Sequence, residues 1–229
     1  MINQLKLLAS HRDIHLKEGQ RCFIVGDIHG DWHSLQTALS TVQFDLAQDV
    51  LVSVGDIIDR HEDSLKVANW MLTQENIHVV CGNHEKFFLD YIRQPETGFY
   101  YKSSSTGGWW VDLHNEADLL ALAKLMKEKL SIAVTIRQGD KKVGVTHAAS
   151  PDDWYVVENG LLTSDDWLDY IDNRAQCRQA MQGFTTIKSG VDAVVHGHVG
   201  APYFKGGNQH WIDTLYATGK LTLLSAADL

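Results

Sequence analysis

Side chains that can bind metal ions follow three short apolar runs in the first part of the chain. Each run ends at a glycine, and the polar residues come directly after it: Gly26-Asp27-Ile28-His29, Gly55-Asp56 and Gly82-Asn83. The runs are rich in Val, Ile and Phe, which predicts buried strands. Because the carboxyl ends of neighbouring parallel strands meet at one edge of a sheet, we expect these side chains to converge there. Their carboxylate, amide and imidazole groups suit manganese, iron or zinc better than calcium or magnesium alone.

Two histidines further along the chain complete the candidate ligand set. His147 ends the second strand of a predicted hairpin, and His198 follows another apolar strand. His196 is an alternative for the same role. His198 is favoured because it directly follows a glycine, Gly197. The whole set is large enough for two divalent cations that share one bridging carboxylate. Two cations roughly 3.5–4 Å apart can stabilise the attacking and leaving oxygens of a phosphoryl displacement, and they lower the pKa of bound water to about 7.

The elements that must position these residues alternate between strand and helix in the first half of the chain. The expected strands and helices follow one another at about 21–26, 31–41, 50–55, 64–73, 77–81 and 86–93. Such alternation predicts a right-handed, parallel α/β arrangement. Residues 1–20 form a lead-in without a strong signal, and 94–108 is a polar loop that could border the site.

The second half is richer in strand patterns and is expected to be antiparallel. Its expected elements are a helix at 117–129, a hairpin of 132–136 with 143–147, a helix-rich piece at 165–189, a strand at 193–195, and a hairpin of 210–213 with 221–224. We therefore expect an α/β fold in which a β-sandwich of two mixed sheets is flanked by helices. No linker or repeat divides the chain, so residues 1–229 are expected to form a single domain.

The composition is that of a soluble globular protein, with 44% hydrophobic and 21% charged residues among 229. A formal net charge of −9 argues against a nucleic-acid partner, which would require clustered Lys and Arg. No stretch is long and apolar enough for a membrane span, and the first residues lack the features of a signal peptide. Cys22, Cys81 and Cys177 are typical of core cysteines in a reducing compartment. We therefore expect a cytoplasmic location.

The ordered motifs resemble those of a known family. The stretches that carry the resemblance are GDIHG at 26–30, GDIIDR at 55–60, GNHE at 82–85, GGWW at 107–110, HGH at 196–198 and WIDT at 211–214. Together they are similar to the metal-dependent phosphoprotein phosphatases of the calcineurin-like phosphoesterase superfamily, and most of all to the small bacterial and phage-lambda type of Ser/Thr protein phosphatase. The resemblance extends from about Cys22 to Leu224, and it implies the calcineurin-like metallophosphoesterase fold.

The resemblance also implies a role for each candidate residue. Asp27 and His29 would bind the first metal and Asp56 would bridge both, while the ligands of the second metal would be Asn83, His147 and His198. His84 would be the general acid that protonates the leaving group, with Asp59 orienting it. Arg60 and a second arginine would hold the phosphoryl oxygens; Arg174 fits that second role best, with Arg178 as the alternative. From the residues alone, Asp59 and Arg60 could instead form a plain surface ion pair.

The implied activity is hydrolysis of phosphomonoesters by a hydroxide bound to two divalent metal ions, which attacks in line. The expected metal is manganese, with iron, zinc or magnesium as alternatives, and the expected substrates are proteins or peptides phosphorylated on serine or threonine, with tyrosine as a further option. One alternative is a symmetrical diadenosine tetraphosphate hydrolase of the same superfamily. Another is a catalytically silent metal-binding module. Nothing in the sequence indicates a regulatory subunit.

The chain departs from the family pattern at a few positions near these motifs. His61 stands where glycine usually follows GDxxDR, Ala149 stands where small bacterial members often carry Asp, and Leu215 stands where glycine is expected. Residues 166–178 match only loosely. None of the departures removes a candidate metal ligand, so they bear on substrate choice and rate. Trp109 and Trp110 are expected to be core and groove-wall residues.

Overall fold

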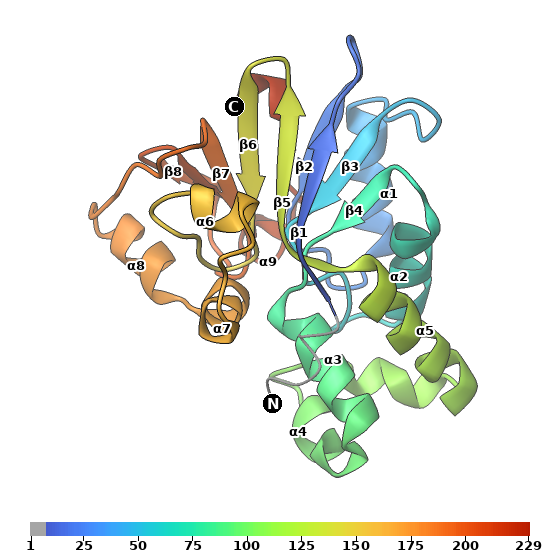
Figure 1. Ribbon diagram of the computed structural model, residues 1–229. Helices are drawn as coiled ribbons and strands as arrows, with labels where there is room; N and C mark the ends of the chain where they lie inside the picture. Colours follow the sequence, from blue (N-terminus) through green and yellow to red (C-terminus); the bar gives the residue numbers. More distant parts are fainter. Residues whose placement is uncertain (1–7) are drawn as a thin grey trace.

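Two β-sheets packed against each other form the centre of the protein in the computed structural model, which describes residues 8–229 (Figure 1). The larger sheet has the strand order β1-β5-β6-β7-β9-β8. Its strands are β1 (Ala9–His15), β5 (Ser131–Gln138), β6 (Lys141–Val145), β7 (Ala193–His196), β9 (Gln209–Trp211) and β8 (Phe204–Gly206). Both parallel and antiparallel pairs occur in it, so the expectation of a mixed sheet is confirmed.

The smaller sheet carries the three strands that precede the metal-ligand motifs. Its order is β10-β2-β3-β4, and its strands are β10 (Leu223–Ser225), β2 (Cys22–Val25), β3 (Val50–Ser53) and β4 (Ile77–Val79). Strands β2, β3 and β4 are parallel, as expected, and Val25, Ser53 and Val79 lie side by side at their carboxyl ends. Because the three strands end level, the residues that follow them leave the sheet at one edge.

Alternation along β2 shows how one strand contributes to two layers of core. Cys22 and Ile24 pack in a cluster with residues of the larger sheet, such as Val134 and Val145. Phe23 belongs instead to a cluster formed with the helices. Successive side chains of a strand point to opposite faces, so a continuous apolar run is what a strand buried on both faces requires.

Helices cover both outer faces of the pair of sheets (Figure 1). The smaller sheet packs against α1 (Trp32–Thr41), α2 (Ser64–Thr73), α3 (Asn83–Arg93) and α5 (Glu116–Lys129). The helices on the side of the larger sheet are α6 (Tyr155–Glu158), α7 (Ser164–Asp172) and α8 (Ala175–Met181). The remaining short helices are η2 (Pro95–Thr97), α4 (Gly98–Tyr101), η3 (Gly108–Leu113), α9 (Leu215–Thr218) and η4 (Ala226–Asp228). The fold is therefore the helix-flanked sandwich of two mixed sheets that the sequence predicts.

The predicted hairpin of 210–213 with 221–224 is wrong. Strand β9 pairs with β7 and β8 in the larger sheet, whereas β10 pairs with β2 in the smaller one. An apolar strand pattern shows that a segment is buried but does not identify its partner. The expectation of an antiparallel second half is wrong in part. The predicted hairpin of β5 with β6 is antiparallel, as is the pair of β8 with β9, but β6 and β7 are parallel, as are β7 and β9.

The described part of the expected lead-in at 1–20 contains an edge strand, β1. Strand β1 runs parallel to β5, but of its seven residues only Ile14 is buried. An edge strand exposed in this way lacks the apolar run that would reveal it in the sequence.

The helix-rich piece at 165–189 ends at Met181, and the expected loop at 94–108 contains η2 and α4. The three cysteines are unpaired and buried, as expected. Within 8–229, no helix has the length and apolar character needed to cross a membrane.

Candidate metal centre

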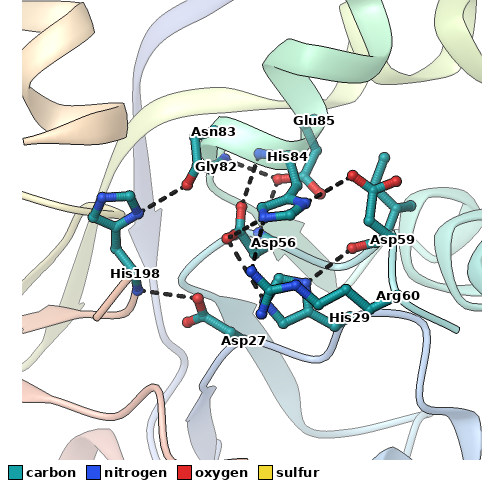
Figure 2. Close-up of polar contacts among 12 residues, drawn as sticks. Asp27, His29, Asp56, Asp59, Arg60, Gly82, Asn83, His84, Glu85 and His198 are labelled. Carbon is teal, nitrogen blue, oxygen red and sulfur yellow. Dashed lines mark hydrogen bonds and ion pairs between the residues drawn. The ribbon is translucent and has the colours of Figure 1, made fainter. Parts of the chain in front are cut away.

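The six predicted metal ligands meet where strand ends of the two sheets face each other. Figure 2 shows five of them, which are Asp27, His29, Asp56, Asn83 and His198. Asp27 follows β2, Asp56 follows β3 and Asn83 begins α3 after β4, while His147 and His198 follow β6 and β7. His29 lies two residues beyond Asp27. All six are buried. The convergence predicted for the first three motifs is present, and the larger sheet brings in the two later histidines.

Left-handed backbone at the strand ends turns these side chains toward one another. The φ angles of His29, Asp56 and His198 are 48°, 50° and 72°. Such conformations cost about 1–3 kcal/mol each in residues other than glycine, and they cluster at functional sites. Two neighbouring glycines allow the close packing, because a Cβ atom at Gly82 would overlap Asp56 Oδ1 and one at Gly197 would overlap Asp27 Oδ1.

One half of the site gathers possible metal-ligand atoms from four residues. His147 Nδ1 donates to the Val54 carbonyl at 2.8 Å, which directs Nε2 toward the site. That nitrogen lies 3.3 Å from Asp56 Oδ2 and 3.1 Å from Asn83 Oδ1. His198 Nδ1 lies 2.8 Å from the same Asn83 oxygen. Acceptors this close repel one another unless a proton or a cation lies between them, so these four residues fit a divalent cation.

The other half of the site contains His29, Asp27 and Asp56. His29 Nδ1 donates to the Ile58 carbonyl at 3.1 Å, and Nε2 lies 3.9 Å from Asp56 Oδ2. Asp27 Oδ2 accepts the backbone N–H of His198 at 3.0 Å, but Oδ1 is buried without a hydrogen-bond partner (Figure 2). Burial and the nearby Asp213 raise the pKa of Asp27. A buried carboxylate oxygen without a partner is unfavourable, and a cation would compensate it. These residues therefore fit a second divalent cation.

The geometry links the two halves through Asp56. Ligand atoms of His29, Asp56 and His84 lie within 4.8 Å of one another, and so do those of Asp56, His147 and His198. Asp56 is common to both groups, as expected of a bridging carboxylate. His84 stands in the first group in place of Asp27, so proximity alone does not separate a ligand from a general acid. The distinction comes from the hydrogen bonds of His84.

His84 forms a buried hydrogen-bonded pair with Asp59. Its Nδ1 donates to Asp59 Oδ2 at 2.7 Å, and Nε2 faces the cavity, where Arg60 Nη2 lies 3.2 Å away (Figure 2). Burial lowers the pKa of His84, but the carboxylates of Asp56 and Asp59 overcome this effect and raise it overall. In the surface ion-pair alternative Asp59 would face Arg60, whereas the structure turns Asp59 toward His84.

A cavity of about 100 Å³ opens beside these groups and contains the two expected phosphate-binding arginines. It is lined by His29, Asp56, Arg60, Asn83, His84, Arg174, His198, Gly200, Asp213 and Tyr216. Arg174 is therefore at the site, and Arg178 is not among the lining residues. Arg60 also lies over the ring of Tyr216, with 5.3 Å between its Cζ and the ring centroid.

Two residues of the cavity wall, Asp213 and Tyr216, were given no role from the sequence, although Asp213 lies in the WIDT stretch. Asp213 is buried in the cavity wall, where burial and then the Asp56 carboxylate raise its pKa to about 6. It follows β9 in the way that Asp27 follows β2, so the same strand-end signal could have identified it. Tyr216 reaches the cavity from α9, the short helix that begins at the unexpected Leu215. No local pattern identifies Tyr216.

Glu85, which the sequence analysis treated only as part of GNHE, joins two of the strand-end loops. Its carboxylate accepts backbone N–H groups of Asp56 at 2.8 Å, Ile57 at 2.9 Å and Gly82 at 2.9 Å. Asp56 Oδ1 in turn accepts the N–H of His84 at 3.0 Å. These bonds fix the backbone of Asp56 against the first turn of α3.

The two-sheet α/β sandwich thus gathers histidine and carboxylate side chains that could hold metal ions at its facing strand ends. The sequence pattern of calcineurin-like phosphoesterases matches residues 21–202. The chain belongs to this family, which uses divalent metals, and it is a phosphoesterase of the hydrolase class.

Individual relatives carry two different activities in their names. The chain is 31% identical to Serine/threonine-protein phosphatase 2 of Salmonella typhimurium over 94% of this chain and 97% of that protein. It is 30% identical to a symmetrical bis(5'-nucleosyl)-tetraphosphatase of Coxiella burnetii, over 68% of this chain and 51% of that protein. A solved structure of a candidate diadenosine tetraphosphatase has a TM-score of 0.63, with 20% identity and 93% of both chains covered. That structural likeness concerns the fold.

Proposed function

We propose that this protein is a protein phosphatase that removes phosphate from phosphoserine and phosphothreonine, with phosphotyrosine as a further substrate. The observation that carries the proposal is the end-to-end similarity to a bacterial Ser/Thr protein phosphatase, which covers 97% of that relative. The size of the cavity supports it. At about 100 Å³ the cavity is small, so in this proposal only the phosphoryl group enters it and the rest of the substrate lies at the surface.

The proposed ligands are those expected from the sequence. Asp27, His29 and Asp56 would hold one cation, while Asp56, Asn83, His147 and His198 would hold the other. When bound, two divalent cations supply a nucleophile with a pKa near 7 and neutralise charge on the phosphoryl oxygens. The backbone carbonyls of Ile58 and Val54 keep the ligand nitrogens of His29 and His147 directed at the site. Manganese remains the proposed metal.

His84 is the proposed general acid. Its Nε2 faces the cavity, and its Nδ1–H is held by Asp59, so a proton on Nε2 is directed at the leaving oxygen of a bound phosphoester. The leaving serine or threonine alkoxide is a strong base and needs that proton. Asp59 orients the imidazole and stabilises its positive charge before the transfer. Arg60 lies beside Nε2 and faces the same space, where it can bind a phosphoryl oxygen.

Arg174→Ala is expected to lower kcat/KM for a phosphothreonine peptide about tenfold, mainly through a higher KM. A hydrogen bond to a charged group contributes about 1.5–3 kcal/mol, and the exposed position of Arg174 favours the lower part of that range. The matched control is Arg178→Ala, which removes an exposed arginine of the same helical region outside the cavity lining. Steady-state kinetics of both variants test the assignment. An equal loss in the two variants would contradict it.

The proposed function is tested by phosphate release from manganese-loaded protein. Peptides with phosphoserine, phosphothreonine or phosphotyrosine are compared with diadenosine tetraphosphate, whose cleavage is followed by nucleotide formation. We expect turnover of the peptides, serine and threonine foremost. Turnover of the dinucleotide alone would favour the second candidate, a symmetrical tetraphosphatase, which the similarity to the Coxiella protein supports. Metal binding without any turnover would favour a catalytically silent module.

A further inference from the structure

The second carboxylate oxygen of Asp59 is held by two residues from a segment that the roles proposed above do not use. Asp59 Oδ2 accepts from His84, whereas Oδ1 accepts from the Tyr101 hydroxyl at 2.6 Å and from Trp110 Nε1 at 2.6 Å. Tyr101 ends α4 and Trp110 lies in η3. All four side chains are buried. The buried carboxylate thus has three donors, of which only one belongs to the proposed proton-transfer pair.

The same segment also fixes the backbone around Asp59. Asp59 and Arg60 both have left-handed backbone, with φ angles of 74° and 69°. The Arg60 N–H donates to the Gly107 carbonyl at 2.8 Å. Gly107 itself has a φ of 84°, and a Cβ atom there would lie 2.6 to 2.9 Å from Arg60 atoms. Only glycine permits this approach, so η3 packs directly on the loop that presents Asp59 and Arg60.

We propose that Tyr101 and Trp110 are positioning residues for protonation of the leaving group. They anchor Oδ1 of Asp59, and this anchor directs Oδ2 at His84 Nδ1. The inference rests on the proposed role of His84 as general acid. Neither residue faces the cavity, so neither touches the substrate.

Hydrogen bonds to both oxygens determine how firmly the Asp59 carboxylate is held. A carboxylate held at one oxygen can rotate about its Cβ–Cγ bond, whereas donors on both oxygens fix its plane. Tyr101 and Trp110 approach from separate helices and are themselves locked by packing: the Tyr101 ring stacks on Tyr91 with centroids 5.2 Å apart, and the Trp110 ring lies 5.6 Å from that of Phe88. Because Asp59 is held in this way, the His84 ring keeps a fixed orientation, as a preorganised catalytic group requires.

The test is the leaving-group dependence of the rate. Tyr101→Phe removes one oxygen and keeps the ring, and Trp110→Phe removes the N–H. Both are assayed as manganese-loaded full-length protein on a phosphoserine peptide, on phenyl phosphate and on 4-nitrophenyl phosphate, whose leaving group departs without protonation. We expect kcat on the phosphoserine peptide to fall about 10- to 100-fold, and kcat on 4-nitrophenyl phosphate to change less than threefold. Phenyl phosphate should lie between them.

Controls separate this role from a structural one. Tyr100→Phe alters a neighbouring, exposed aromatic residue that does not bond to Asp59 and should leave all rates unchanged. In a His84→Asn background, Tyr101→Phe should cause no further loss, because the effect passes through His84. An equal loss on all substrates, no loss, or an additive loss in that background would overturn the inference.

His84→Asn by itself separates failure of the inference from failure of the proposed function. If its loss depends on the leaving group but that of Tyr101→Phe and Trp110→Phe does not, the positioning role is wrong and the general acid stands. If the loss in His84→Asn is the same on every substrate, the general-acid role fails, and the positioning role fails with it.

Discussion

Replacing His84 by Asn is expected to slow hydrolysis of a phosphoserine peptide by about 100- to 10,000-fold, which is the usual contribution of a general acid. The reason lies in the two ring nitrogens. Asn can still place a donor toward Asp59, but it offers no ionisable proton at the position of Nε2, the atom that faces the cavity (Figure 2). The alkoxide must then depart unprotonated.

The measurement combines single-turnover rates with the metal content and the unfolding midpoint of the same preparation. Two bound metals and an unchanged midpoint would show that the lost rate reflects chemistry. His33→Asn is the matched control, because His33 is an exposed histidine of α1 outside the cavity lining. A His84→Asn variant that released one of its metals would identify His84 as a ligand, which its proximity to His29 and Asp56 also allows.

The parts of the site that the sequence predicts are those coded by local patterns. Each strand-end motif contains its own apolar run, its glycine and its polar residues within a few positions. The equal ends of β2, β3 and β4 then bring Asp27, Asp56 and Asn83 together without further information. Alternating strands and helices usually form a right-handed parallel arrangement. This topological rule, and not the local sequence, predicts that the three strand-end motifs lie close together.

The support around Asp59 could not be predicted in this way. Its hydrogen bonds to Tyr101 and Trp110 join residues 42 and 51 positions apart, and no spacing rule links them. The sequence indicated correctly that Trp110 is a core residue. It could not show that the indole N–H points at a carboxylate, because burial patterns describe environment and not direction.

The same limitation explains the errors in strand pairing. The apolar character of β10 predicts that it is buried, but Leu224 pairs with Ile24, which is 200 positions away in the sequence, and not with β9 nearby. Between β9 and β10 the chain forms α9, which brings Tyr216 to the cavity. The misplaced hairpin and the missed Tyr216 therefore have one cause.

Asp56→Asn is expected to abolish binding of both metals, and the rate should fall to background with them. Asp56 is the only residue common to the two groups of candidate ligands found within residues 8–229. Its Oδ2 lies 3.3 Å from His147 Nε2 and 3.9 Å from His29 Nε2, so a single oxygen faces both halves of the site. Asn keeps the shape but removes the negative charge that a bridging ligand shares between two cations.

Bound manganese, measured by elemental analysis after gel filtration, tests this expectation independently of activity. Asp49→Asn is the matched control: Asp49 is also a buried aspartate, but it pairs with Arg21 outside the cavity lining, so its loss should leave two metals bound. Retention of two metals in Asp56→Asn would show that the two halves of the site are independent. Loss of one metal alone would assign Asp56 to a single cation.

Burial raises the pKa of Asp56, but the nearby imidazoles of His147, His84 and His29 outweigh it and lower the pKa overall. A carboxylate that is already charged would be ready to hold a cation.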